Sequence, residues 1–282
     1  VAGDVAEARP EARNPIPAPT TSGIPRALHD LVISLPYNGF EALERTVRQA
    51  WGDVAAIIVE PIMGNVAGIM PQPGWLELIR SLCDEYGIVM IMDEVKTGFR
   101  IAPGGAQEYF GVEGDLATYA KAMGNGFPIA AIGGKREVME SVGPGRTAHG
   151  GTYCGNVVGT SAADATLEII ARGEALKTVE TRGKVLMKGV HGILTDADIP
   201  HHMLGGPSMF SIALSEEEPI DVRGWAKTDE GLYEEIMMGL QDRGAMPEVD
   251  GAEPWFLCAA LSEKDVDDTL NYFDEAVAEA KA

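Results

Sequence analysis

The sequence predicts an α/β fold, in which a mostly parallel sheet with flanking helices is followed by a smaller α+β domain. Two short apolar runs, at residues 54–59 and 88–92, are bounded by polar residues and are typical of buried strands in a parallel sheet. An amphipathic stretch at 73–85 separates them, which gives the strand–helix–strand order of a βαβ unit. Beyond residue 200, strand-like runs alternate with helical stretches in a pattern that suits a small α+β domain.

The composition argues against several classes of protein. The chain has 282 residues, of which 45% are hydrophobic, and this is enough for a sizeable core. Its net charge of −21 argues against nucleic acid or an anionic membrane as a partner. No apolar run reaches the roughly eighteen residues that a membrane span needs. Cys83, Cys154 and Cys258 are widely spaced without a metal-ligand pattern, so we expect no metal and reduced thiols in a cytoplasmic protein.

The chain divides into three parts. Residues 1–21 are rich in Ala, Pro and Glu without an apolar period, and we expect a loop or a disordered segment there. Residues 22–174 are expected to belong to a large domain and residues 175–282 to form a small carboxyl-terminal domain.

Apolar periodicity predicts the elements of the large domain. Residues 31–35 form an apolar run typical of a short strand, and apolar residues recur at helical spacing over 40–51 and 73–85. Further strands are expected at 54–59, 88–92 and 128–134, with an apolar-leaning segment at 116–120. An Ala-rich stretch at 157–172 predicts a helix, and Gly173 is a suitable stop for it. In the small domain we expect helices at 176–194, 232–243 and 264–280 and strands at 209–214 and 255–261.

A carboxylate and a lysine follow two of these segments. Asp93 comes directly after the run at 88–92, and Lys121 directly after the segment at 116–120. Ligands bind at the carboxyl ends of strands in such sheets. A buried lysine loses its proton readily and then forms Schiff bases with carbonyls, and pyridoxal phosphate enzymes pair such a lysine with a carboxylate on the pyridine nitrogen. Taken singly, an Asp after a strand more often caps a loop, and a lone Lys is more often solvated.

Four sequence blocks place this pair in a wider pattern. They are EPIMGN at 60–65, DEVKTGFR at 93–100, KAMGNGFPIA at 121–130 and GTYCGN at 151–156. In order and spacing they resemble the class III aminotransferases, most closely the glutamate-1-semialdehyde aminomutase-like branch, over most of the chain from about residue 22. The resemblance implies the pyridoxal phosphate transferase fold type I, with an incomplete large domain that binds the cofactor. It also implies a small-molecule amino donor, a carbonyl acceptor, and a homodimer or larger assembly with shared active sites.

The resemblance also implies roles for single residues. Lys121 would carry pyridoxal 5′-phosphate as a Schiff base and move the proton between substrate and cofactor. Asp93 would bind the pyridine nitrogen, and Val95 would pack on the ring. Thr152 and the backbone near Gly151 would reach the cofactor phosphate of the neighbouring subunit, where a hydroxyl and amides are suitable donors.

Three further residues are expected near the substrate. Glu60 and Asn65 would line the pocket, and Glu253 would approach its entrance. Arg100 is weighed as a structural residue ahead of a ligand for a substrate carboxylate. The adjacent histidines His201 and His202 are interpreted as surface residues ahead of a metal pair.

The sequence departs from the family pattern at its amino-terminal side. In the family, a loop with Ser or Gly followed by Thr and Glu holds the phosphate, and an aromatic residue stacks on the ring. Neither is found in the 282 residues. We therefore expect either a missing amino-terminal segment or chain, or a naturally shortened member whose neighbouring subunits supply these contacts.

Three functions stay open at this point. The first is amino transfer between an amino acid or amine and a carbonyl acceptor, which the GNGFP motif at 124–128 favours. The second is the intramolecular transfer of a glutamate-1-semialdehyde 2,1-aminomutase, which the motif EPIMGN favours. The third is an inactive or regulatory homologue without a complete site.

Overall fold

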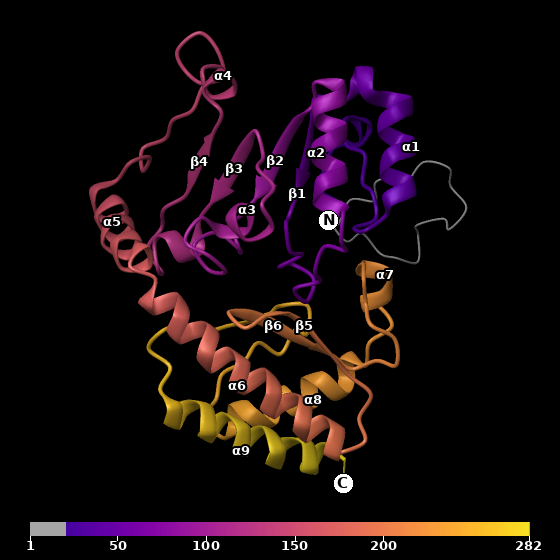
Figure 1. Cartoon of the computed structure of the whole chain (residues 1–282), viewed down its shortest axis with the longest axis vertical. Helices are drawn as coiled ribbons and strands as arrows, with labels where there is room; N and C mark the ends of the chain where they lie inside the picture. Colours follow the sequence, from indigo (N-terminus) through magenta and orange to yellow (C-terminus); the bar gives the residue numbers. More distant parts are fainter. Residues whose placement is uncertain (1–20, 282) are drawn as a thin grey trace.

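The computed structural model describes residues 21–281, which form two β-sheets with helices around each (Figure 1). The loop predicted at 1–21 therefore lies, apart from Thr21, outside the described residues. The first sheet has the strand order β1-β2-β3-β4, and the second has the order β5-β6-β7. The strands are β1 (Ala56–Val59), β2 (Val89–Asp93), β3 (Leu116–Tyr119), β4 (Ala131–Gly134), β5 (His202–Gly206), β6 (Met209–Ala213) and β7 (Trp255–Phe256).

The helices surround the sheets in chain order. The α-helices are α1 (Phe40–Ala50), α2 (Trp75–Tyr86), α3 (Gly105–Phe110), α4 (Arg136–Met139), α5 (Val157–Ala171), α6 (Glu174–Asp196), α7 (Val222–Trp225), α8 (Glu230–Asp242) and α9 (Glu263–Ala280). Short 3-10 helices are η1 (Arg26–Leu31), η2 (Trp51–Asp53) and η3 (Lys121–Met123). The helices expected at 40–51, 73–85, 157–172, 176–194, 232–243 and 264–280 are confirmed to within three residues at each end.

The first sheet is mostly parallel, as predicted. Strand β1 pairs in parallel with β2, and β2 pairs in parallel with β3, whereas β4 runs antiparallel to β3. The carboxyl ends of β1, β2 and β3 therefore meet at one edge of the sheet. In an α/β sheet this edge is where ligands bind.

The two faces of this sheet differ in their cover. Met90 and Met92 of β2 are fully buried and belong to the same core as residues of α1 and α2. The alternate positions point to the other face, where Ile58 of β1 and Ile132 of β4 stay exposed. Side chains alternate between the faces of a strand. Because Asp93 follows Met92, its side chain lies on the less covered face.

The second sheet is antiparallel and carries the carboxyl-terminal helices. Strand β6 is buried along its whole length and pairs with β5 on one side and β7 on the other. Its core includes Leu186 of α6, Ile236 of α8 and Phe273 of α9, and these three helices lie below the sheet in Figure 1. The smaller α+β part that the sequence predicts is thus present. The boundary expected between 174 and 175 stays a prediction.

The loop after β1 connects the two sheets. The Ala67 amide donates to the Ala252 carbonyl at 2.6 Å. Ala67 is fully buried and shares a core with Leu204 of β5 and Ala213 of β6. The segments that precede β7 are thereby held close to the carboxyl ends of the parallel strands.

The strand predicted at 31–35 is wrong. Leu31 ends η1, and the residues after it form no strand. Leu31 is 77% exposed, and Val32 and Ile33 are also exposed. An apolar run becomes a strand only where a neighbour pairs with it, and within residues 21–281 no strand pairs with this segment.

Two details of the second sheet also differ from the prediction. The strand expected at 255–261 is only two residues long, because β6 offers it just two pairing positions. Strand β5 was not predicted, since its sequence HMLGG combines histidine and glycine without a clear apolar alternation. Among residues 21–281 there is no helix with the length and apolar character required to cross a membrane.

Candidate active site at the carboxyl ends of the parallel strands

Asp93 is the last residue of β2 and is fixed by two hydrogen bonds. It lies opposite Thr118 of β3 in the sheet register. Its Oδ1 accepts from the Thr118 hydroxyl and from the Val95 amide, each at 3.1 Å. The hydrogen bonds found within residues 21–281 do not use Oδ2, so this oxygen is available to a donor on a ligand.

Lys121 follows β3 and is held in an unusual backbone conformation. Its φ of 43° lies in the left-handed region, which a residue with a long side chain adopts at a cost. Burial lowers the pKa of its amine from the ordinary value, and the nearby positive charges of Lys96 and Arg100 lower this pKa as well. The carboxylates of Glu253 and Glu60 act in the opposite direction. A lysine with a lowered pKa supplies the neutral amine needed for attack on a carbonyl.

Glu60 and Asn65 form a small unit after β1. The Asn65 side-chain amide donates to Glu60 Oε1 at 3.0 Å, and its backbone amide donates to Oε2 at 3.2 Å. The charge of Glu60 reaches Lys121. The structure therefore brings these two predicted pocket residues to the same edge as Lys121.

Glu253 comes to this edge from the loop before β7. Its Oε2 accepts from Lys96 Nζ at 2.6 Å, and the same ammonium group donates to the Gly64 carbonyl at 2.7 Å. Lys96 is almost completely buried. Arg100, one turn further on, donates from Nε to the Lys96 carbonyl, and its guanidinium lies 4.6 Å from the centre of the Phe256 ring.

Lys96 and Phe256 were not singled out from the sequence. Their partners are far away in the chain, since Glu253 lies 157 positions after Lys96. The one available signal was the position of Lys96 just after a strand end, where a charged residue is expected to face a ligand.

The loop that carries Val95 and Lys96 is held from below by Glu94. This carboxylate is fully buried. It accepts from the Thr97 hydroxyl, from the Ala106 amide at the start of α3, and from both the backbone and side-chain amides of Gln107. A buried carboxylate with this many donors stays charged and fixes the loop around it.

Gly151 and Thr152 lie apart from this group. They are exposed in the turn that precedes α5, where the Cys154 amide donates to the Gly151 carbonyl. No hydrogen bond within the described part of the chain links Thr152 to Asp93 or Lys121. This placement leaves the predicted contact with a neighbouring subunit untested.

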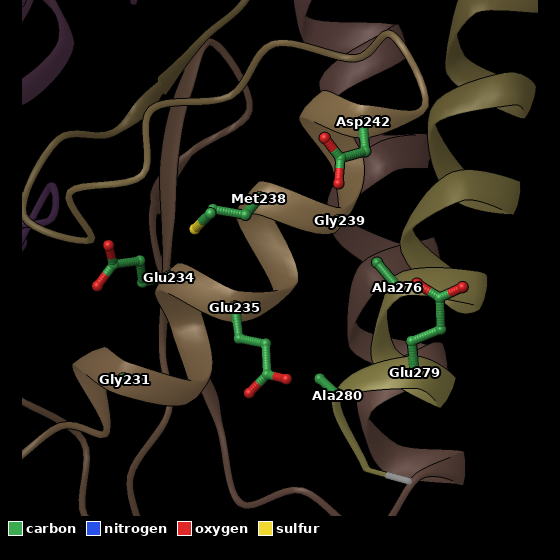
Figure 2. A pocket seen from close by; sticks show the side chains of 9 residues that line it. All are labelled: Gly231, Glu234, Glu235, Met238, Gly239, Asp242, Ala276, Glu279 and Ala280. Carbon is green, nitrogen blue, oxygen red and sulfur yellow. The ribbon is translucent and has the colours of Figure 1, made fainter.

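The histidines and the acidic groove lie elsewhere. His201 Nε2 and His191 Nδ1 are 2.7 Å apart, while His202 lies in β5. Residues 21–281 contain no group of three or more His, Cys, Asp or Glu side chains placed to hold a metal ion. A shallow groove of about 410 Å³ runs between α8 and α9 and carries none of the site residues (Figure 2). Its lining residues are Gly231, Glu234, Glu235, Met238, Gly239, Asp242, Ala276, Glu279 and Ala280.

Comparisons with known proteins agree with the sequence motifs. The family model for class III aminotransferases matches residues 5–276. The glutamate-1-semialdehyde 2,1-aminomutase of Methanothermobacter thermautotrophicus is 37% identical over 265 residues, which cover 94% of this chain and 63% of that protein.

Solved structures show the same fold. An omega-transaminase from Sphaerobacter thermophilus is 29% identical with a TM-score of 0.90, and the match covers 97% of this chain and 63% of that one. A structure described as a transaminase with PLP bound has a TM-score of 0.82 at 19% identity, covering 94% of this chain and 61% of that one. This second likeness concerns the fold alone. The predicted transferase fold type I is confirmed.

The family match extends over nearly the whole chain and includes all four sequence blocks. The chain spans about three fifths of the length of the curated relative. The chain belongs to the class III aminotransferase family.

Proposed function

We propose that this chain forms the lysine-bearing part of a pyridoxal-phosphate-dependent aminotransferase. The reaction moves an amino group between an amino acid or amine and a carbonyl acceptor. The observation that carries this proposal is the placement of Lys121 and Asp93 after neighbouring parallel strands, where Asp93 and Thr118 share one register position. Membership of the class III family supports it.

The residues present fit two parts of the cofactor. Oδ2 of Asp93 is open to a donor and suits the protonated pyridine nitrogen. The Lys121 amine, whose pKa is lowered by burial and by Lys96, suits the aldehyde. Val95, half-buried beside Asp93, suits a ring face. When bound, pyridoxal phosphate withdraws electrons from the substrate carbon through its ring.

Each side chain then has a defined task. Asp93 keeps the pyridine nitrogen protonated through a charge-assisted hydrogen bond. Lys121 Nζ binds the aldehyde carbon covalently and, once the substrate amine has displaced it, moves the proton from the substrate Cα to C4′ of the cofactor. Glu60 and Asn65 line the pocket on the β1 side.

The phosphate end of the site is proposed to be shared between subunits. Thr152 and the backbone at Gly151 are exposed, which suits contacts across a homodimer interface. Further phosphate contacts would come from another segment or chain. This agrees with the 63% share of the curated relative that the chain covers.

Two further expectations remain proposals. The large domain is proposed to end at residue 174, where Gly173 separates α5 from α6. The cytoplasm is the proposed location, because Cys83, Cys154 and Cys258 are free thiols, as is usual for proteins in a reducing compartment.

An aminomutase is the second candidate function. The relative that is 37% identical is a glutamate-1-semialdehyde 2,1-aminomutase. In that reaction the amino group would leave and return to adjacent carbons of one substrate, and Lys121 would act as described above. Product analysis with a single substrate, in the absence of a separate amino acceptor, distinguishes the two reactions.

The assignment of Lys121 is tested by reductive trapping. We expect the chain, saturated with pyridoxal phosphate and treated with borohydride, to carry the reduced cofactor on the peptide that contains Lys121. The Lys121→Ala variant should lose both this adduct and the visible absorbance band of the bound cofactor. Lys184→Ala is the matched control, because Lys184 is an exposed lysine on α6. Its adduct and band should equal those of the unaltered chain.

Two outcomes would contradict the proposal. A cofactor band that persists in Lys121→Ala, or an adduct on Lys96, would refute the role of Lys121. If the unaltered chain and a longer form that includes the expected missing segment both fail to bind the cofactor, the inactive homologue becomes the better explanation.

A further inference from the structure

Lys96 is a buried lysine whose ammonium group is bound by two other loops. Its side chain is only 3% exposed. Nζ donates to the Glu253 carboxylate at 2.6 Å and to the Gly64 carbonyl at 2.7 Å, and it lies 5.6 Å from the centre of the Phe256 ring. A charge-assisted hydrogen bond shielded from water is stronger and better defined than a surface ion pair. Lys96 therefore determines where the Glu253 carboxylate lies.

The same pair lies beside the amine of Lys121. Besides burial, four charged groups change the pKa of Lys121, and they come from three loops. Lys96 and Arg100, from the loop after β2, lower this pKa, while Glu253, before β7, and Glu60, at the end of β1, raise it. Helix α5 also packs against η3, and its first turn has no charged side chain.

We propose that Lys96 is a positioning residue for Lys121, which holds the Glu253 carboxylate in place and balances its charge beside the reacting amine. The inference rests on the proposed function of Lys121 as the lysine that binds the cofactor. It gives a role to a residue that the sequence motifs leave without one. It also explains why a lysine is buried at this position, where an apolar side chain would avoid the cost of desolvation.

The two members of the pair should act on Lys121 in opposite directions. Without Lys96, the site loses a positive charge and Glu253 is left uncompensated, so the protonated amine of Lys121 is favoured. Without the charge of Glu253, Lys96 and Arg100 act alone and the neutral amine is favoured. A pair with a structural role alone would lower stability in both variants without opposite effects on the amine.

The test measures the reactivity of the Lys121 amine in the cofactor-free chain. The chain is treated with trace acetic anhydride at a series of pH values, and mass spectrometry gives the rate of acetylation of the peptide that contains Lys121. Below its pKa an amine reacts in proportion to its neutral fraction, which changes tenfold for each unit. Lys184 serves as the internal reference because it is an exposed amine in the same molecule.

Three variants give the decisive comparison. We expect Lys96→Met to reduce the rate at Lys121, at a fixed pH near neutrality, by at least about threefold, and Glu253→Gln to increase it by at least about threefold. The double variant should lie between them, because both opposing charges are removed. Lys184→Met and Glu180→Gln, which alter the exposed ion pair on α6 in the same chemical way, should leave the rate at Lys121 unchanged.

The outcomes that overturn the inference are equally defined. Shifts in the same direction for both single variants, or no shift in either, would overturn it. If thermal melting shows that Lys96→Met is unfolded, Glu253→Gln alone decides, and an unchanged or lower rate overturns the inference. The acetylation needs no cofactor, so its result is independent of the reductive trapping that tests the proposed function.

Discussion

At the scale of single residues, Gly64 shows how closely the site is packed. A Cβ atom at this position would lie 2.6 Å from Cδ and 2.9 Å from Cβ of Lys96. The Lys96 Cβ atom cannot move without its backbone, so any larger residue at 64 would displace the buried ion pair. The close approach, and not a special backbone conformation, accounts for the glycine.

Gly64→Ala is expected to destabilise the fold by about 1–2 kcal/mol, because overpacking of a well-packed site costs about this much. Urea denaturation of the cofactor-free chain measures the effect. Gly52→Ala is the matched control, since nothing lies within 4 Å of a Cβ added at Gly52. Equal midpoints for the two variants would show that Lys96 can move aside.

The residues of the site were predictable to different degrees. Asp93 and Lys121 follow apolar runs, and the order of the strands is enough to bring them together. The position of Glu253 beside Lys96 could not be derived in this way, because it depends on how the loop before β7 meets the first sheet. Periodicity is a local signal, and a contact across 157 positions leaves no trace in it.

At the scale of elements, Asp115 connects four of them at the edge of the sheet opposite the site. Its carboxylate accepts from the Met90 amide of β2 at 2.7 Å and from Arg80 of α2 at 3.0 Å. It also pairs with Lys135, between β4 and α4, at 2.6 Å. Burial alone would raise the pKa of Asp115, but the hydrogen bonds from Lys135, Met90 and Arg80 outweigh it and lower the pKa.

Asp115→Asn should therefore destabilise the fold at neutral pH by about 2 kcal/mol, the usual cost of losing hydrogen bonds to a charged group. The folded state binds its proton less tightly than the unfolded state, whose carboxyl has a pKa of about 3.9. The stabilisation is thus complete well above that value and is lost as the pH falls through the lower pKa of the folded state.

Urea denaturation at neutral pH and at several acidic values measures this convergence of the variant and the unaltered chain. Asp84→Asn is the control, because Asp84 also pairs with Arg80 but is largely exposed; it should change stability little at any pH. A difference for Asp115→Asn that stayed constant down to strongly acidic pH would contradict the role of its charge.

Elements were predicted best where two signals agreed. Helix α2 has an apolar face and ends at Gly87, whose φ of 69° suits a helix stop, and the prediction matched it closely. The run at 31–35 had only its apolar character. Whether such a run becomes a strand depends on a pairing partner, which the run itself does not encode.

At the scale of the whole molecule, the excess of acidic side chains is the dominant feature. The net charge is −21, with 43 acidic and 22 basic residues. Repulsion between like charges opposes the compact state, and salt screens it over a distance of about 10 Å at 0.1 M and about 3 Å at 1 M.

Raising the sodium chloride concentration from low to about 1 M should therefore raise the melting temperature at neutral pH by about 5 °C. Differential scanning fluorimetry measures it. Sucrose of equal osmolality separates screening from general exclusion effects. Near the sequence pI of about 4.5 the repulsion is small and the salt effect should largely disappear; a salt effect of the same size there would contradict this explanation.

The backbone of Lys121 has a consequence for the history of this chain. A long side chain with φ of 43° is held at a cost of about 1–2 kcal/mol relative to glycine. A descendant kept only as a scaffold would gain stability from Lys121→Gly and would lose nothing else. A lysine at this position is therefore the mark of a chain still under selection for its amine, which sets it apart from a homologue that has abandoned chemistry.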